Sequence, residues 1–327
     1  NPSVVIVSDA IQYDKIKKII KSKPFIKKIL SFEQIKDAND IMCIKNIFEK
    51  KKYQEKNFLN LDISRKDIAC IIYTSGTQGN PKGVMLSHGG ILSNCEGALF
   101  LLKDFTSKKA RFLTWLPLSH SYEHTVQFVQ IALGAKVFYA ESIEKLIKNM
   151  GECNPDIMTA VPRFYQNLYQ KINASFNKTN GLKKYLINKM LSLGEKAFFK
   201  NKLSNLEKVQ NFICEKLVRK KIKAQFGGSL KLFISGGGAL DKDVGVFLNA
   251  IGLPTLQGYG LTETSPVVSC NPKDDIRIDT VGPAFAANEV KIADDGEILV
   301  KGENVMLGYW NNEEETKKVL NDGWLST

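Results

Sequence analysis

The stretch from Tyr73 to Gly83, Tyr-Thr-Ser-Gly-Thr-Gln-Gly-Asn-Pro-Lys-Gly, decides how the rest of this sequence is interpreted. It follows an apolar run, Ala69 to Ile72, that is typical of a buried strand, and a helical pattern begins at Ser87. Such a loop suits a triphosphate, because glycine lets backbone N–H groups approach oxygens, hydroxyls donate hydrogen bonds, and the Lys82 ammonium balances charge. The sequence therefore predicts a strand, a phosphate-binding loop and a helix in succession.

An ordinary polar turn is the alternative for this loop, since Gly, Ser, Thr and Pro are common in turns. Eleven residues in a fixed order are more specific than a glycine pair, which favours the phosphate loop. The usual P-loop is excluded, because it needs a Lys followed directly by Ser or Thr and Gly83 stands there.

Length and composition indicate a globular chain, because 327 residues with 43% hydrophobic residues can bury a large core. No apolar run reaches the ~18 to 20 residues that a membrane-spanning helix needs, and no charged region precedes an apolar core at the N-terminus. The six cysteines are far apart, without a Cys-x-x-Cys pair. We expect a reduced, cytoplasmic chain without structural zinc.

The net charge of +12 is concentrated in one segment. Residues 163–225 contain fifteen Lys and Arg and three acidic residues, so the remainder of the chain is neutral overall. Apolar residues interleave with these lysines, as in a helix that lies on an anionic membrane, although a solvated charged face on helices that pack inward has the same composition. A basic nucleic-acid-binding protein is a distant alternative, because no binding fold or aromatic stacking pattern accompanies the charge.

Alternating strand and helix patterns predict an α/β fold with parallel strands. Two strand ends carry glycines: Lys231 to Ile234 runs into Ser235 to Ala239, and Leu256 to Tyr259 runs into Gly260 to Thr264. Ligands bind at the carboxyl ends of strands in open parallel sheets, so these turns and the phosphate loop could converge on one nucleotide. The triple glycine taken alone is also compatible with a simple turn.

Together, the phosphate loop and Gly-Tyr-Gly-Leu-Thr-Glu, residues 258–263, resemble motifs of the AMP-forming adenylating superfamily. The run Leu-Pro-Leu-Ser-His-Ser-Tyr-Glu-His-Thr, residues 116–125, resembles the acyl-site motif of its long-chain fatty acyl-CoA synthetases. Gln78 and His124 depart from the pattern, since the family usually has Thr or Ser at the first position and often Arg at the second. Without this context, a lone His such as His120 is more often a hydrogen-bonded core residue.

The resemblance implies a role for each matching residue. Lys82 would neutralise the outer phosphates, Tyr259 would stack on adenine, Thr262 would lie near the α-phosphate, Glu263 would bind Mg²⁺, and His120 would lie beside the carboxyl group. The implied catalytic residues are Lys82, His120, Thr262 and Glu263, with Glu263 as the metal ligand. The implied ATP-binding residues are Thr74, Ser75, Gly76, Thr77, Gln78, Gly79, Lys82, Gly237, Gly238, Ala239, Gln257, Gly258, Tyr259, Gly260 and Thr262. ATP, Mg²⁺ and CoA are the implied cofactor and substrates.

The same resemblance implies stacked, mostly parallel sheets with helices on their faces and a small β-rich subdomain. The expected division is 1–108 with the phosphate loop, 109–276 with the helical basic insertion 163–225, and 277–327 with the β-rich part. We expect about a hundred residues of the first subdomain to precede the chain. The ribose-binding Asp, the hinge and a C-terminal catalytic Lys are expected beyond its end.

The expected function is ATP-dependent activation of a medium- or long-chain fatty acid to an acyl-adenylate, followed by transfer to CoA. Adenylation of an aryl or amino acid is the alternative. The helix that opens at Pro162 either borders an acyl tunnel, as the resemblance of Thr159 to Ile172 implies, or is a plain structural helix, because apolar spacing does not separate the two. The expected location is cytoplasmic, with peripheral contact of residues 163–225 with an anionic membrane.

Overall fold

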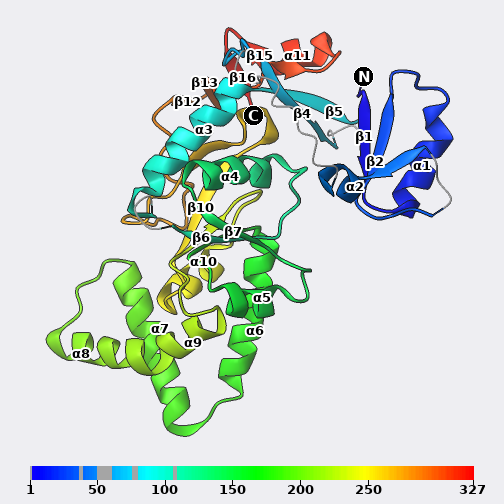
Figure 1. Ribbon diagram of the computed structural model, residues 1–327. Coiled ribbons are helices and arrows are strands. Elements are labelled where there is room, and N and C mark those ends of the chain that lie inside the picture. Colours follow the sequence, from blue (N-terminus) through cyan, green and yellow to red (C-terminus); the bar gives the residue numbers. More distant parts are fainter. Residues whose placement is uncertain (1, 37–39, 50–60, 76–79, 106–108) are drawn as a thin grey trace. The chain divides into compact units, whose positions relative to one another are not determined.

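The computed structural model describes residues 2–36, 40–49, 61–75, 80–105 and 109–327 (Figure 1). These residues belong to two compact units, Asn1–Asp62 and Ile63–Thr327. The candidate site described below lies entirely within the second unit. The subdomain division into 1–108, 109–276 and 277–327 stays a prediction.

The first unit contains β1 (Val4–Val7), α1 (Ala10–Ile20), β2 (Lys28–Ser31), β3 (Ile41–Cys43) and α2 (Ile44–Glu49). Its strands are ordered β1-β2-β3 and run parallel, as the alternation of strand and helix predicts. The carboxylate of Asp9 accepts a hydrogen bond from the backbone N–H of Gln12 at 2.9 Å, and α1 begins after this N-cap. Val7, Tyr13 and Ile29 form the small buried core.

A six-stranded sheet is the centre of the second unit, with the order β11-β10-β9-β8-β6-β7. Its strands are β6 (Arg111–Thr114), β7 (Lys136–Tyr139), β8 (Ile157–Ala160), β9 (Leu232–Ser235), β10 (Thr255–Gly260) and β11 (Val267–Cys270). All neighbours run parallel except β11, which is antiparallel to β10. The parallel part therefore collects the carboxyl ends of β8, β9 and β10 at one edge.

Helices cover both faces of this sheet because apolar side chains alternate between the faces along each strand. Ile157 and Leu232 belong to a core shared with α3 (His88–Leu101) and α4 (Ser121–Ala132). Met158 and Phe233 belong to the opposite core, shared with α5 (Leu146–Cys153), α6 (Pro162–Asn177), α7 (Gly181–Phe198) and α10 (Lys242–Ala250). The mixed α/β class with helices on the sheet faces is confirmed.

One element near the phosphate loop differs from the expectation. A strand, β5 (Lys82–Ser87), lies between the loop and α3, and it pairs antiparallel with β4 (Ile68–Thr74). Thr74 faces Lys82 across this pair, so the predicted loop joins the two strands of a hairpin. The prediction that a helix follows the loop directly was wrong. Ser87, where the helical pattern was expected to begin, is the N-cap of α3, and its hydroxyl accepts from the N–H of Gly90 at 2.9 Å.

The β-rich end of the chain forms a four-stranded antiparallel sheet ordered β12-β13-β16-β15. Its elements are β12 (Asn288–Ile292), β13 (Ile298–Gly302), β15 (Leu320–Asn321) and β16 (Trp324–Ser326). The predicted hairpin around Asp294 to Gly296 is present as β12 and β13. A short strand, β14 (Gly308–Tyr309), pairs instead with β5, and α11 (Glu313–Val319) follows it.

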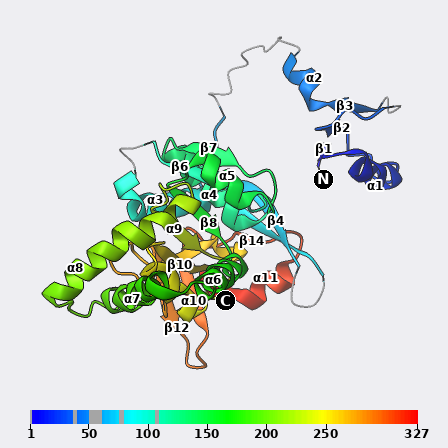
Figure 2. The same ribbon diagram turned by 90° about the horizontal axis from the view of Figure 1, so that it is seen from below.

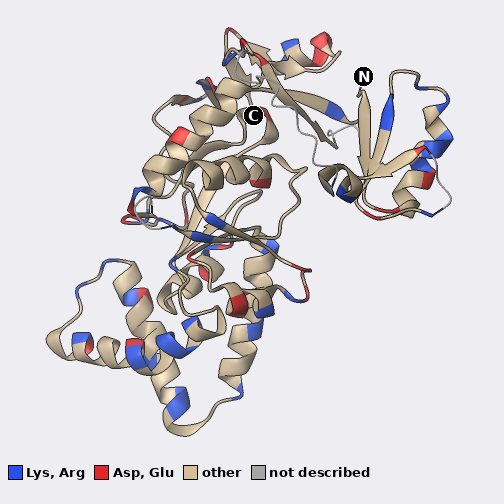
Figure 3. Ribbon diagram, viewed as in Figure 1, with Lys and Arg blue, Asp and Glu red and all other residues tan. Residues whose placement is uncertain are grey.

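The basic segment forms a helical layer beside α10. After α6 and α7 it contains α8 (Asn205–Cys214), a π-helical turn (Glu215–Arg219) and α9 (Lys220–Gln225). Arg219 is buried and holds this layer together: its Nε donates to the carbonyl of Ala250 at 2.8 Å and its Nη2 to that of Met190 at 3.1 Å. Figures 1 and 2 show α8 at the periphery of the layer, and Figure 3 shows the Lys and Arg residues gathered on these helices.

Candidate active site

A cavity of about 690 Å³ opens in the second unit, where the β4–β5 hairpin, α3, α4 and the ends of β9 and β10 meet. Ten of the residues predicted from sequence line it: Thr74, Ser75, Lys82, His120, Gly237, Gly258, Tyr259, Gly260, Thr262 and Glu263. Segments that are far apart in the sequence therefore converge as the motif analysis predicts. Whether each residue has the assigned role stays a prediction.

Lys82 is the cation at the polar end of the cavity. It begins β5, and its Nζ lies 2.5 Å from Oε2 of Glu315 on α11 and 5.0 Å from the centre of the Tyr309 ring. The Tyr309 hydroxyl donates to Oε1 of Glu263 at 2.9 Å. Burial, together with the neighbouring Glu263 carboxylate, raises the pKa of Tyr309. Tyr309 thus connects the predicted phosphate ligand to the predicted metal ligand.

A 3₁₀ turn, Thr262–Thr264, presents Glu263 to the cavity and is fixed by backbone contacts. The carbonyl of Glu263 accepts from the N–H of Met306 at 2.8 Å. Asn94 on α3 binds both sides of the turn, donating from Nδ2 to the Thr264 carbonyl at 3.2 Å and accepting at Oδ1 from the N–H of Val267 at 2.7 Å. Asn94 thus connects the backbone of the turn that carries Glu263 to α3, the helix that follows the strand of Lys82.

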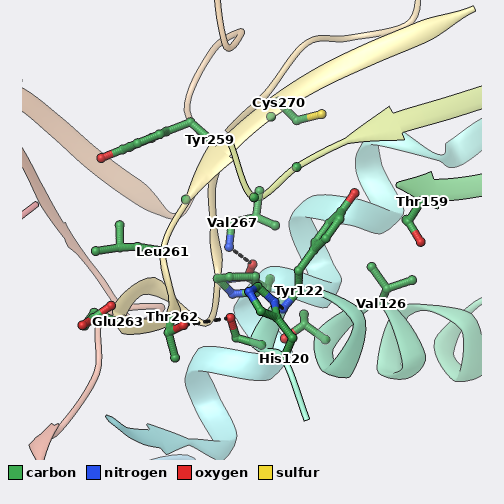
Figure 4. Close-up of a pocket in the computed structure, with 18 of the residues that line it drawn as sticks. His120, Tyr122, Val126, Thr159, Tyr259, Leu261, Thr262, Glu263, Val267 and Cys270 are labelled. Atoms are coloured by element: carbon green, nitrogen blue, oxygen red, sulfur yellow. Dashed lines mark hydrogen bonds between the residues drawn. The ribbon is translucent and has the colours of Figure 1, made fainter. Parts of the chain in front are cut away.

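His120 and Thr262 lie near one another in the cavity lining (Figure 4). His120 is the N-cap of α4, where its Nδ1 accepts from the N–H of Tyr122 at 3.2 Å. This bond requires an unprotonated Nδ1, which leaves Nε2 as the N–H donor of the neutral ring. The Thr262 hydroxyl lies 3.2 Å from that of Ser121, the first residue of α4. The turn and the start of α4 thus supply donors to one region.

Glycines shape the strand ends near the expected base site. A Cβ on Gly260 would overlap the carbonyl oxygen of Pro266, so no larger residue fits there without movement of the backbone. Gly237 has a φ of 77°, a backbone conformation that is strained for a residue with a side chain. Tyr259, which precedes Gly260 and also lines the cavity, donates its hydroxyl proton to Oγ1 of Thr327 at 2.8 Å.

The structure does not bring every predicted ATP-binding residue to the cavity. Gln257 is buried, and its amide is bonded to backbone groups: Oε1 accepts from Leu240 at 2.5 Å and Nε2 donates to the carbonyls of Ile278 and Thr280. Gly238 and Ala239 are exposed but do not line the cavity. The predicted residues Gly76, Thr77, Gln78 and Gly79 lie outside the described residues.

Apolar side chains line much of the cavity, and although the sequence predicted an acyl tunnel, it did not identify these residues as its lining. They come mainly from α3 and α4: Ala98, Leu101, Leu102, Val126 and Val129, together with Phe112, Val267 and Phe285. Helix α3 offered a signal, since from His88 to Leu101 it carries one charged residue, Glu96, and a helix that is apolar nearly all round is buried on several sides.

The helix α6, which was considered as a border of an acyl tunnel, contributes no residue to this cavity. Tyr165, Leu168 and Ile172 of α6 are buried in the core against β8 and β9. Thr159, at the end of β8, is the one residue of the range from Thr159 to Ile172 in the cavity lining. The structure therefore favours the structural interpretation of α6.

Glu123 lies behind the cavity wall as a buried carboxyl group. It is 1% exposed, and its Oε2 accepts from the hydroxyl of Thr159 at 2.8 Å. Its Oε1 makes no hydrogen bond to the described residues. Burial raises the pKa of Glu123 to about 7 from 4.5, because the charged form loses its hydration.

The residues around Glu263 fit a magnesium ion that brings its own phosphate ligands. Among the described residues no group of three or more His, Cys, Asp or Glu could hold a metal ion. Mg²⁺ in nucleotide sites is often bound by one or two carboxylates with phosphate oxygens and water completing its shell. The Tyr309 hydroxyl takes up one acceptor position of Oε1 and orients the carboxylate, which leaves the other lone pairs of Glu263 for a metal ion.

Comparison with known proteins places the chain in a family. The profile of the AMP-binding enzyme family matches residues 1–310. Long chain acyl-CoA synthetase 6, peroxisomal, of Arabidopsis thaliana is 34% identical over 278 residues, which cover 80% of this chain and 38% of that protein. Long chain acyl-CoA synthetase 4 of the same plant is 30% identical, covering 97% of this chain and 52% of that protein. The chain belongs to the AMP-binding enzyme family and spans about half the length, or less, of these relatives.

Solved structures agree with this assignment at the level of the fold. Apo MatB from Rhodopseudomonas palustris has a TM-score of 0.70 at 22% identity, covering all of this chain and 56% of its own. O-succinylbenzoate coenzyme A synthetase from Bacillus subtilis in complex with AMP has a TM-score of 0.62 at 20% identity, covering 96% of this chain and 57% of its own. The fold is that of adenylate-forming enzymes.

Proposed function

We propose that this chain is the nucleotide- and acyl-binding part of an enzyme that activates a medium- or long-chain fatty acid with ATP and transfers the acyl group to CoA. The observation that carries the proposal is one cavity in which Thr262 and Glu263 lie on one side and Val126 of α4 on the other (Figure 4), with further apolar lining from α3 and α4. The polar end suits a triphosphate and the apolar end suits an alkyl chain. The long-chain acyl-CoA synthetases among the relatives support the same substrates.

In the first step, an oxygen of the fatty acid carboxylate attacks the α-phosphorus of ATP and the bond to the bridging oxygen breaks. This gives acyl-adenylate and pyrophosphate. Lys82 neutralises charge on the departing phosphates, and the Thr262 hydroxyl donates to an oxygen of the α-phosphate. Mg²⁺ bound through Glu263 would neutralise further phosphate charge. His120 donates from Nε2 to the carboxyl group and orients it.

In the second step, the thiolate of CoA attacks the acyl carbon and AMP leaves with the bonding electrons. The carbonyl oxygen gains negative charge, which the donors near Thr262 and His120 stabilise. No covalent intermediate with the protein is required. Catalysis then depends on charge neutralisation and on orientation of the reacting groups.

The apolar end of the cavity favours a fatty acid over other acids. Each buried methylene contributes ~0.8 kcal/mol to binding, so eight extra methylenes add several kcal/mol relative to acetate. An amino acid would need a carboxylate near its ammonium group. Among the described lining residues, Glu263 is the one acid, and it lies at the polar end. This arrangement supports an alkyl chain.

Peripheral membrane contact through residues 163–225 is part of the proposal. Leu168, Ile172, Met190 and Leu193 are buried, and Phe164 is partly buried against the core. Helix α8 and the π-helical turn carry exposed apolar side chains at helical spacing: Leu206, Val209, Phe212, Ile213 and Leu217. Lysines flank this stripe, which is the pattern of a helix on an anionic lipid surface. We therefore propose that α8 and the π-helical turn make the membrane contact, rather than the whole of residues 163–225.

A cytoplasmic location at the face of a membrane is the setting that we infer for such an enzyme, because its substrate partitions into lipid. Across the part of the chain that the structure describes, no helix has the length and apolar character needed to cross a bilayer.

Exchange of labelled pyrophosphate into ATP by the full-length protein tests the proposed reaction. We expect exchange to depend on the added acid, with palmitate and decanoate far above acetate, benzoate and amino acids. Equal exchange with acetate and palmitate would contradict the acyl site, and preference for an amino acid would assign the enzyme to another class of substrate.

A further inference from the structure

Lys82 already has an anionic partner within the chain. Its Nζ lies 2.5 Å from Oε2 of Glu315, although 233 residues separate the two in sequence. Both side chains are mostly shielded from solvent, with 21% of Lys82 and 27% of Glu315 exposed. The ammonium group proposed to bind phosphate oxygens is therefore paired with a carboxylate of the same chain.

Glu315 has a second cation that can keep its charge balanced. Its Oε1 lies 2.7 Å from Nζ of Lys318, one turn further along α11. Its backbone N–H donates to Oδ1 of Asn312 at 3.2 Å, which fixes the start of α11. Release of Lys82 would therefore leave Glu315 paired with Lys318 and α11 in place.

We propose that Glu315 is an internal counter-ion that the β- and γ-phosphates of ATP displace from Lys82, so that this carboxylate determines how tightly the triphosphate is held. A carboxylate beside phosphate oxygens repels them, and its bond to Lys82 must break before Lys82 can reach the nucleotide. After the reaction, Glu315 competes with pyrophosphate for Lys82, and this competition favours the release of pyrophosphate. This inference rests on the proposed role of Lys82 at the outer phosphates.

The test compares Glu315→Gln with Glu314→Gln in the full-length protein. Both changes remove one negative charge from α11, and both residues contact Lys318, but Glu314 is 84% exposed and its carboxylate pairs with Lys318 rather than Lys82. Kd is measured by calorimetry for α,β-methylene-ATP, which cannot react, and for AMP, both with Mg²⁺. Thermal unfolding of both variants confirms that they are folded.

We expect Glu315→Gln to lower the Kd for the ATP analogue by up to about five-fold, as for one partly exposed ion pair. The Kd for AMP stays the same, because AMP has no outer phosphates to compete with Glu315. Inhibition by pyrophosphate becomes stronger by a similar factor. Glu314→Gln leaves all three values unchanged.

A Kd for the ATP analogue that is unchanged or higher in Glu315→Gln overturns the inference, since Glu315 would then support nucleotide binding or be irrelevant to it. Lys82→Ala separates this failure from failure of the proposed site. If Lys82→Ala leaves the Kd of the analogue unchanged, the phosphate role of Lys82 is wrong. If Lys82→Ala weakens binding, Glu315→Gln lowers the Kd less in that background than in the parent, because the competition for Lys82 no longer exists and only the direct repulsion of the phosphates is removed.

Discussion

Replacing Glu123 by Gln tests the consequence of burying a carboxyl group behind the cavity wall. With its pKa raised to about 7 from 4.5, Glu123 binds a proton in the folded protein over a pH range in which the unfolded chain has lost it. The free energy of unfolding therefore falls as the pH rises from 4.5 to about 7. The full loss corresponds to about 3 kcal/mol, at 1.36 kcal/mol per pH unit.

Gln has the same shape and can accept the same hydrogen bond from Thr159, but it does not ionise. Any constant cost of the amide group is the same at every pH, so the informative quantity is how the difference between variant and parent changes with pH. We expect Glu123→Gln to gain about 3 kcal/mol relative to the parent between pH 4.5 and pH 7.5.

Urea unfolding followed by circular dichroism at several pH values measures this difference. Glu289→Gln, an exposed position on β12, is the matched control for removal of one carboxylate. A stability difference between Glu123→Gln and the parent that is equal at pH 5 and pH 8 would refute the reasoning. It would mean that Glu123 is hydrated or paired when the protein is folded.

Two further predictions concern function. Lys82→Ala and Glu263→Gln should each lower acyl-adenylate formation by on the order of 10²- to 10³-fold, because Lys82 neutralises phosphate charge directly and Glu263 would do so through bound Mg²⁺. Pyrophosphate exchange, with circular dichroism as a folding control, measures this effect, and normal exchange would remove the role assigned to that residue. Phe212→Ser together with Leu217→Ser should weaken co-sedimentation with anionic liposomes, whereas Leu182→Ser, an exposed apolar residue on α7, should not. Equal recovery with neutral and anionic vesicles, or binding that is indifferent to salt, would leave the lysines as a solubilising surface.

The sequence alone predicted those strands whose apolar run ends at a recognisable turn. The ends of β9 and β10 and the hairpin of β12 and β13 were predicted, because strand runs there stop at glycines or at an Asp-Asp-Gly turn. Strand β5 was missed because the loop motif includes Lys82 and Gly83, and the apolar run that remains, Val84 to Leu86, is shorter than a typical strand signal. Its identity as a strand depends on pairing with β4 and, 222 or more residues away in the chain, with β14.

The polar residues of the candidate site were predictable from sequence motifs, whereas its apolar lining was not. Motif order brought Lys82, His120, Thr262 and Glu263 to one cavity, since strand ends in a parallel sheet share an edge. The apolar lining by α3 and α4 could not be separated from core packing, because a helix face against a ligand and one against protein have the same composition. The contact of Lys82 with Glu315 depends on tertiary structure alone.

The double hydrogen bond of Asn94 has a consequence for the entropy of catalysis. Helix α3, which carries Asn94, continues directly from β5, so the strand that begins at Lys82 and the turn that carries Glu263 are joined before any nucleotide binds. A second connection passes through residues 306 and 307, because the N–H of Met306 donates to the carbonyl of Glu263 and the N–H of Leu307 donates to the carbonyl of Met85 on β5. The backbone that carries these two charged groups is thus fixed when the protein folds, and binding energy need not be spent on ordering it. This is preorganisation of the framework, and the cost that remains for a triphosphate at Lys82 is the release of that side chain from Glu315.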